Sequence, residues 1–301
     1  THKSSQSYIL TDLSEEDHQE YYNGFANSVL WPILHYRIDL AEFTRRDLSG
    51  YLRVNEHFAN ELLKVVLPSD LLWVHDYHFI PLGDELRKRG LTNRIGFFLH
   101  VPFPAPEFMT VLPHHERLLS SLLQYDLVGF QTDGDVQNFI RYVISEHPGS
   151  NIGVFQATNR QVVLNQNDRQ IRVGAFPVGV DTVEFEKRAR LAARSSFVKK
   201  AVESLDGRTL MIGVDRLDYS KGLTQRMEAV DLFFSNRPDW RGKVTYLQIA
   251  PKSRSEIQEY QELGQALGAI AGRINGKFGE VAWTPIRYVN RAYSRTELAG
   301  L

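Results

Sequence analysis

Six short apolar runs recur along the chain at intervals that suit alternating strands and helices. They are Leu71–His75, Ile95–Val101, Leu127–Gln131, Ile171–Phe176, Thr209–Val214 and Val244–Ala250. Most of these runs do not alternate between apolar and polar residues, which is typical of strands buried on both faces of a parallel sheet. Helical spacing appears between them, as in the apolar stripe of Leu223, Met227, Val230 and Phe234. The pattern predicts an α/β fold with doubly wound parallel sheets.

A basic segment from about Asp181 to Arg208 interrupts this rhythm. Its lysines and arginines are interleaved with apolar residues, which is typical of an exposed amphipathic helix. A chain of 301 residues can form one large domain or two of ordinary size. Because the basic segment lies between two α/β blocks, we expect two domains, residues 1–181 and 182–301.

Composition excludes several classes of protein. The 35 lysines and arginines nearly balance the 36 acidic residues, which argues against a nucleic-acid binder, because such a protein needs clustered positive charge. The chain has no cysteine, which excludes disulfides, thiol nucleophiles and cysteine-ligated metals. The charge-free stretch Ile95–Pro106 is too short for a membrane span and contains three prolines. We therefore expect no membrane association and a cytoplasmic location.

Other motifs are absent or cut short. There is no phosphate loop of the G-x-x-x-x-G-K-[ST] type, no G-x-G-x-x-G fingerprint and no G-x-S-x-G elbow. ATPase, dehydrogenase and α/β-hydrolase functions are therefore disfavoured.

Ser294 and Glu297 have the spacing of a helix capping box, yet the sequence ends soon afterwards at Leu301 and begins with Thr1. We expect a fragment of a longer protein, with its second domain incomplete.

Ionisable residues lie at the ends of two of the predicted strands. Because ligands bind beyond the carboxyl ends of parallel strands, Asp76 and His100 could position or polarise a hydroxyl group. The alternative is a structural aspartate that caps the next helix and a packed histidine. His75 and His78 lack a zinc motif and a third ligand at a known spacing, so we expect no metal site.

The loop from Arg216 to Gly222 has the features of an anion site. It connects a predicted strand to a helix that begins at Gly222, and it carries two cations, Arg216 and Lys221. Unpaired N–H groups and the positive dipole end of a helix suit a diphosphate. The alternative is an exposed loop with ordinary basic residues.

A second basic loop follows the run that ends at Ala250. Ser253 and Glu256 have the spacing of a capping box, so Lys252 and Arg254 are expected beside a helix N-terminus that could bind a phosphate.

An early helix is expected to open at Ser14 and to run toward Leu30, where Pro32 would stop it. Tyr22 and Trp31 fall within or near this helix. Such aromatic side chains are more often core or surface residues than platforms for a sugar.

Several dispersed motifs together resemble the trehalose-6-phosphate synthase family, glycosyltransferase family 20. The matching segments are Tyr21–Pro32, Trp73–His78, Gly96–Pro104, Asp126–Thr132, Arg216–Gly222 and Ala271–Lys277. They cover nearly the whole chain in the family's order. The resemblance implies a GT-B fold, in which two Rossmann-like domains flank a cleft. Residues 1–181 would bind the acceptor, and residues 182–301 would form part of the nucleotide-sugar domain.

The resemblance also implies a reaction, the transfer of glucose from UDP-glucose to glucose 6-phosphate with retention of configuration. Arg216 and Lys221 would hold the donor diphosphate, and His100 would face the donor glucose. Tyr22, Trp31 and Asp76 would surround the acceptor sugar. Asp76, His100, Arg216 and Lys221 would take part in catalysis.

The phosphate of the acceptor would bind Arg254. The resemblance implies no metal and no further cofactor, and it leaves the oligomeric state open, a homo-oligomer included. The family's N-terminal donor loop and a later Asp-Gly-Met-Asn-Leu segment are not in the sequence. Three alternatives stay open: another nucleotide-glucose donor, a cyclitol acceptor, or a non-catalytic subunit that senses sugar phosphates.

Overall fold

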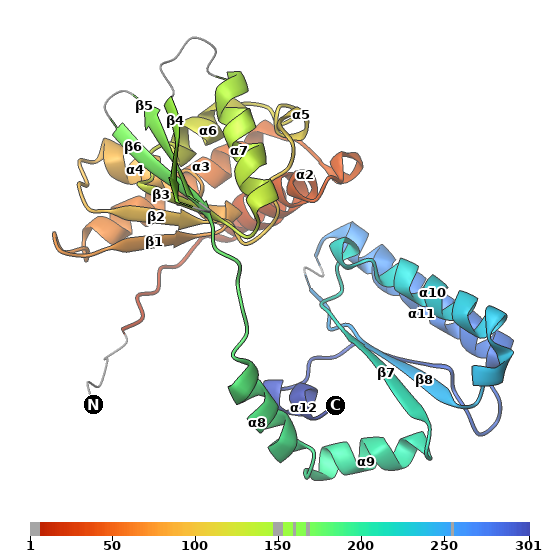
Figure 1. The fold of residues 1–301 in the computed structure, drawn as a ribbon. Coiled ribbons are helices and arrows are strands. Elements are labelled where there is room, and N and C mark those ends of the chain that lie inside the picture. Colours follow the sequence, from red (N-terminus) through yellow and green to blue (C-terminus); the bar gives the residue numbers. More distant parts are fainter. Residues whose placement is uncertain (1–6, 147–152, 159–160, 167–168, 254–255) are drawn as a thin grey trace. The chain divides into compact units, whose positions relative to one another are not determined.

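The computed structural model describes residues 7–146, 153–158, 161–166, 169–253 and 256–301 (Figure 1). The chain divides into two compact units, Thr1–Val178 and Gly179–Leu301. The division falls close to the boundary expected after residue 181. Each unit has its own sheet and its own set of buried apolar side chains.

The first unit is built on a six-stranded sheet. Its strands, in the order in which they lie side by side, are β1 (Leu72–His75), β2 (Ile95–Phe98), β3 (Leu127–Phe130), β6 (Arg169–Ala175), β5 (Gln161–Gln166) and β4 (Gly153–Thr158). The first four strands are parallel, which confirms the runs predicted from the sequence. The remaining two form an antiparallel hairpin against β6, which the sequence did not predict.

The parallel strands of this sheet follow one another in a single direction. Right-handed crossovers therefore place their connecting helices on one face. The helices of this unit that follow the N-terminal segment are η2 (Ile38–Leu40), α3 (Arg45–Leu63), η3 (Tyr77–Phe79), α4 (Leu82–Lys88), α5 (Pro106–Met109), α6 (His115–Leu122) and α7 (Asp133–Glu146). Leu72 and Val74 of β1 are buried, whereas Trp73 between them is 67% exposed and lines an open pocket of about 630 Å³ over the sheet.

The N-terminal helical segment consists of three pieces that follow one another directly: α1 (Glu15–Asp17), the π-helix η1 (His18–Leu30) and α2 (Trp31–Leu34). The Ser14 side chain accepts a hydrogen bond from the Asp17 N–H at 3.0 Å, which confirms the expected start. The expected stop at Pro32 was wrong, because Pro32 lies inside α2. Pro32 has no N–H for the Ser28 carbonyl, which instead accepts the N–H of Glu42 at 3.0 Å.

The second unit is built on three parallel strands, β7 (Thr209–Val214), β8 (Val244–Ile249) and β9 (Ile286–Val289). Its helices are α8 (Thr182–Ala192), α9 (Ser196–Leu205), η4 (Tyr219–Lys221), α10 (Leu223–Asn236), η5 (Pro238–Trp240), α11 (Gln258–Phe278) and α12 (Arg295–Gly300). Figure 1 shows α10 and α11 on one side of the sheet and α8, α9 and α12 on the other. The predicted stripe on α10 is buried at all four positions. The short strand β9 was not predicted.

Two further expectations concern helix ends and membranes. The capping box of Ser294 and Glu297 is present at the start of α12. Among the described residues, no helix combines the length and the apolar character that crossing a membrane requires.

Candidate active site

Asp76 and His100 lie together at the carboxyl ends of β1 and β2. The His100 backbone N–H donates to Asp76 Oδ1 at 3.2 Å. Asp76 has φ 71° and ψ 169°, a backbone conformation that L residues rarely adopt. Its side chain does not cap η3, and His100 is exposed rather than packed, so neither alternative structural role is observed. Strained backbone of this kind is concentrated at functional sites.

His75 is a neighbour that the sequence did not single out for this site. Its Nδ1 lies 2.9 Å from Nε2 of His100, and the two rings stack with their centroids 5.2 Å apart. Partial burial and the nearby His100 lower the pKa of His75 below its ordinary value, although Asp76 opposes this shift. Because a hydrogen bond between two imidazoles needs one nitrogen without a proton, at least one ring of the pair is neutral.

Tyr22 and Trp31 gather around the loop that begins at Asp76. The Tyr22 ring stacks on His78 with a centroid distance of 5.6 Å and an interplanar angle of 13°. Trp31 lies 5.7 Å from the Tyr77 ring and is only 4% exposed. Tyr22 is partly exposed and can offer ring surface to a ligand, whereas most of Trp31 is enclosed by protein.

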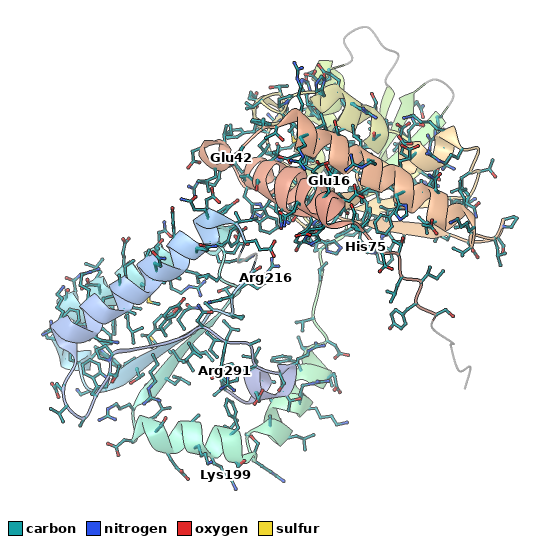
Figure 2. The ribbon with its side chains drawn as sticks, turned by 180° about the vertical axis from the view of Figure 1, so that it is seen from behind. Glu16, Glu42, His75, Lys199, Arg216 and Arg291 are labelled. Carbon is teal, nitrogen blue, oxygen red and sulfur yellow. The ribbon has the colours of Figure 1, made fainter. Side chains whose placement is uncertain are left out.

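In the second unit, the loop after β7 has the geometry that the sequence predicted. Arg216 follows β7 closely (Figure 2), and both Arg216 and Lys221 are exposed. The buried Asp218 side chain accepts the Ser220 N–H at 2.9 Å and shapes the turn. Gly222, the N-cap residue of α10, has φ 61°, a conformation that glycine adopts readily. The loop therefore presents two cations at the start of a helix.

An ion pair that the sequence did not reveal closes the base of this loop. The Arg226 guanidinium donates to Asp215 Oδ2 at 2.7 Å and to the Lys221 carbonyl at 3.4 Å. These contacts tie the beginning of the loop to its end. The only sequence signal was the position of Arg226 one helical turn after Gly222.

A pocket of about 440 Å³ opens at the carboxyl ends of the strands in the second unit. Its lining includes Leu217, Lys252, Ser253, Tyr260 and Asn290. The volume suits a ligand of the size of a nucleotide or sugar phosphate. Tyr260 and Asn290 were not predicted, because Tyr260 belongs to α11, whose start was expected earlier, and Asn290 follows β9, a strand that was not predicted.

The second basic loop differs from the expectation. The predicted capping box of Ser253 and Glu256 was wrong, because α11 begins later, at Gln258. Ile257 holds the position before the helix in an extended conformation, and its side chain makes no cap hydrogen bond. Lys252 lies in the loop after β8 and lines the pocket. Arg254, the residue expected at the acceptor phosphate, lies outside the described residues.

Within the described part of the chain, one group of side chains has the composition of a metal site. His115, Glu116 and Glu146 bring three ligand atoms within 4.8 Å of one another. His75 and His78 do not belong to this group.

Both units thus carry ionisable side chains at the carboxyl edges of parallel sheets, an arrangement found in α/β enzymes that bind phosphorylated ligands. The family model of glycosyltransferase family 20 matches residues 1–301. The chain belongs to glycosyltransferase family 20.

Named relatives agree with this assignment. The trehalose-6-phosphate synthase of Sinorhizobium fredii is 50% identical over 295 residues, which are 98% of this chain and 62% of the relative. The enzyme of the same name from Klebsiella pneumoniae is 42% identical over 293 residues, which are 96% of this chain and 59% of the relative. The chain therefore spans about three-fifths of the length of these relatives.

Solved structures confirm the predicted fold class. An α,α-trehalose-phosphate synthase (UDP-forming) from Burkholderia xenovorans, in complex with glucose 6-phosphate, matches with a TM-score of 0.91 and 40% identity over 95% of this chain and 62% of that chain. A trehalose-6-phosphate synthase structure from E. coli, bound with UDP-2-fluoro glucose, matches with a TM-score of 0.88 and 42% identity over 96% of this chain and 62% of that chain.

Proposed function

We propose that the protein carrying this chain transfers glucose from UDP-glucose to glucose 6-phosphate with retention, forming α,α-trehalose 6-phosphate and UDP. The observation that carries this proposal is the family match over all 301 residues. Relatives with the synthase name, and related structures bound to glucose 6-phosphate and to a UDP-glucose analogue, support it. A cytoplasmic location is part of the proposal and fits a chain without cysteine.

The donor side of the proposal depends on the loop after β7. Arg216 and Lys221 bind the diphosphate, and their charges stabilise the negative charge that develops as UDP leaves. His100, on the first unit, faces the donor glucose. The second unit is accordingly the nucleotide-sugar domain.

The acceptor side depends on the first unit. The Asp76 carboxylate accepts a hydrogen bond from a sugar hydroxyl, and Tyr22 and Trp31 contribute aromatic surface beside it. The phosphate of the acceptor is assigned to Arg254, a residue of the second unit. The positive φ of Asp76 supports this role, because strained backbone of this kind is concentrated at functional sites.

Retention follows from a same-face route. We assign no side chain as a nucleophile, so the acceptor oxygen bonds to the anomeric carbon on the face from which the diphosphate leaves. The bond from that carbon to the diphosphate oxygen breaks, and the departing oxygen takes the proton of the acceptor hydroxyl. Charge stabilisation by Arg216 and Lys221 serves this step directly.

Replacement of Lys221 by alanine tests the proposed leaving-group role. In the protein carrying this chain, Lys221→Ala should lower turnover by roughly 10²–10³-fold, because one contact to developing charge is lost. Lys243→Ala is the matched control, since this exposed lysine precedes β8 at the opposite edge of the same sheet. Unchanged turnover in a folded Lys221→Ala protein would remove Lys221 from the reaction.

A further inference from the structure

The π-helix η1 is the most unusual element of the first unit. It runs for 13 residues, whereas most π-helices are single turns, and they occur frequently at functional sites. No side chain caps its start, since Asp17 makes no cap hydrogen bond there. The helix carries Tyr22 and leads into Trp31. Its start directly continues α1, and among the described elements α3 packs against it most extensively.

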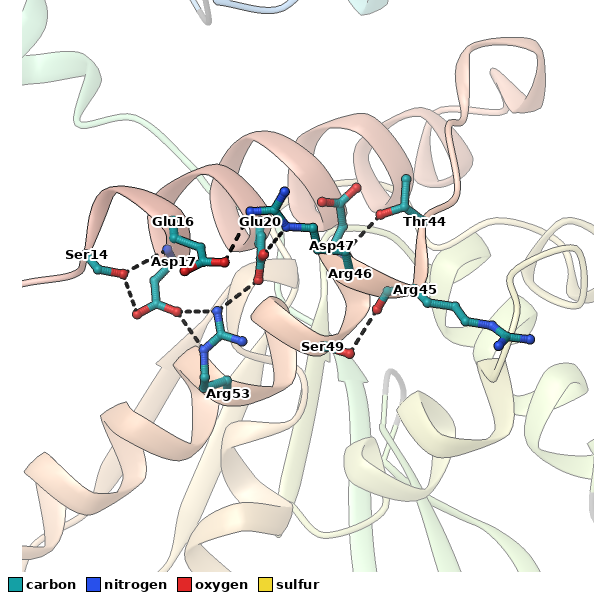
Figure 3. A network of polar contacts seen from close by, with 10 residues as sticks. All are labelled: Ser14, Glu16, Asp17, Glu20, Thr44, Arg45, Arg46, Asp47, Ser49 and Arg53. Carbon is teal, nitrogen blue, oxygen red and sulfur yellow. Dashed lines mark hydrogen bonds and ion pairs between the residues drawn. The ribbon is translucent and has the colours of Figure 1, made fainter.

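Glu20 provides such a contact from the buried side of η1. Its carboxylate is only 5% exposed and accepts hydrogen bonds from two guanidinium groups of α3, Arg46 through Nε and Arg53 through Nη2, the latter at 2.8 Å (Figure 3). Arg46 and Arg53 are two helical turns apart and share one face of α3. Together they hold the pKa of Glu20 below its ordinary range. Charge-assisted pairs of this kind are strong and directional.

The same arginines also reach α1, the short helix that directly precedes η1. Arg53 Nε donates to Asp17 Oδ1 at 2.8 Å, and Arg46 Nη2 donates to Glu16 Oε1 at 3.1 Å. Glu16 is 64% exposed, so its pairing is screened by water. Glu20 is therefore the buried centre of the network.

The opposite side of η1 faces the acceptor residues of the proposed reaction. Tyr22 follows Glu20 by two positions, so in a helix with bonds between residues i and i+5 their side chains leave in nearly opposite directions. Tyr22 stacks on His78, which lies two residues after Asp76. A shift of η1 on α3 would therefore displace Tyr22 relative to Asp76.

We propose that Glu20 is a positioning residue for acceptor binding. Held by Arg46 and Arg53, it fixes η1 on α3 and thereby fixes Tyr22 beside the loop of Asp76. Glu20 itself does not contact the substrate. The inference rests on the proposed function, because it takes Tyr22 and Asp76 as contacts of the acceptor sugar.

The test is Glu20→Gln in the protein carrying this chain, because glutamine keeps the shape of the side chain and removes its charge. The KM for glucose 6-phosphate should rise by roughly tenfold to a hundredfold, since small misplacements of binding groups are costly. The kcat and the KM for UDP-glucose should change by less than about twofold. A merely structural role would lower stability and the active fraction without raising one KM selectively.

Glu16→Gln is the matched control, because it loses a charge from the same network at an exposed position, and it should leave all kinetic constants unchanged. If Glu20→Gln does not fold, Arg46→Gln removes one of the two guanidinium groups and should raise the same KM less. An unchanged KM for glucose 6-phosphate in a folded variant overturns the inference.

A second readout separates this inference from the proposed function. The ring-proton NMR signals of Tyr22 report its stacking on His78, and they should shift in Glu20→Gln and remain in place in Glu16→Gln. If the unsubstituted protein does not use glucose 6-phosphate, the proposed function fails, and the Tyr22 signals alone decide whether Glu20 positions that ring. Unshifted Tyr22 signals in Glu20→Gln contradict the inference.

Discussion

Contacts between side chains at the strand ends could be predicted only in part from the sequence. The sequence places Asp76 and His100 near each other, because each follows one of two neighbouring parallel strands. Their contact depends on the positive φ of Asp76, which no local pattern predicts. The pairing of His75 with His100 was missed for a related reason, since a histidine inside an apolar run suggests either a core residue or a metal ligand.

The His75–His100 pair gives a pH prediction at this scale. The pKa of His75 should lie below its ordinary value, because partial burial and the neighbouring His100 both disfavour its charged form. The unfolded chain then binds this proton at higher pH than the folded one, so stability from this group is lost as the pH falls below about 6.5. NMR titration should show the pKa of His75 moving up in His100→Gln. A His75 pKa unaffected by that substitution would argue against the contact.

Elements were predictable where the apolar pattern is continuous. Four strands of the first unit and two of the second stand where the sequence predicts them. The hairpin β4–β5 was missed because polar residues interrupt its sequence and leave only short apolar runs, of which Val162–Leu164 is the longest. The start of α11 was misplaced because Ser253 and Glu256 match a capping box by spacing alone. The direct contact between η1 and α3 could also not be predicted from the sequence, because it depends on residues far apart in the chain.

Gly50 of α3 permits this contact and gives a prediction at the scale of elements. A Cβ atom at Gly50 would lie much closer to the Glu20 Cβ than van der Waals contact allows. The Glu20 Cβ cannot move away easily, because it is not the end of a flexible side chain. Gly50→Ala should therefore lower the free energy of unfolding by about 1–3 kcal/mol, as overpacking does. Denaturant titration measures this change.

Gly268→Ala is the control for that experiment. Gly268 lies inside α11 and has no neighbour within 4 Å of an added Cβ, so alanine should stabilise the helix by roughly 0.5–1 kcal/mol. Equal effects of the two substitutions would contradict the close approach of η1 and α3.

The whole chain consists of two units with separate cores. In the second unit, Met227, Phe234 and Ile274 are completely buried between helices and sheet. In the first unit, Phe97, Phe130 and Phe139 are likewise buried. Two units were predictable from the interruption of the α/β rhythm, whereas the roles proposed for them rest on the family resemblance.

Phe234→Ala tests the separation of the cores. Loss of this side chain should destabilise the second unit by about 3–5 kcal/mol, the usual cost of a large cavity. Hydrogen exchange should show faster exchange of the β8 amides and unchanged protection of the β2 amides. Equal loss of protection in both strands would show that the two cores unfold together.

Release of UDP from UDP-glucose, measured with and without glucose 6-phosphate, tests the central claim most directly. The protein carrying this chain should release UDP at a rate that depends on glucose 6-phosphate, with trehalose 6-phosphate formed in equal amount. No UDP release under either condition, or release to an acceptor other than glucose 6-phosphate, would contradict the account.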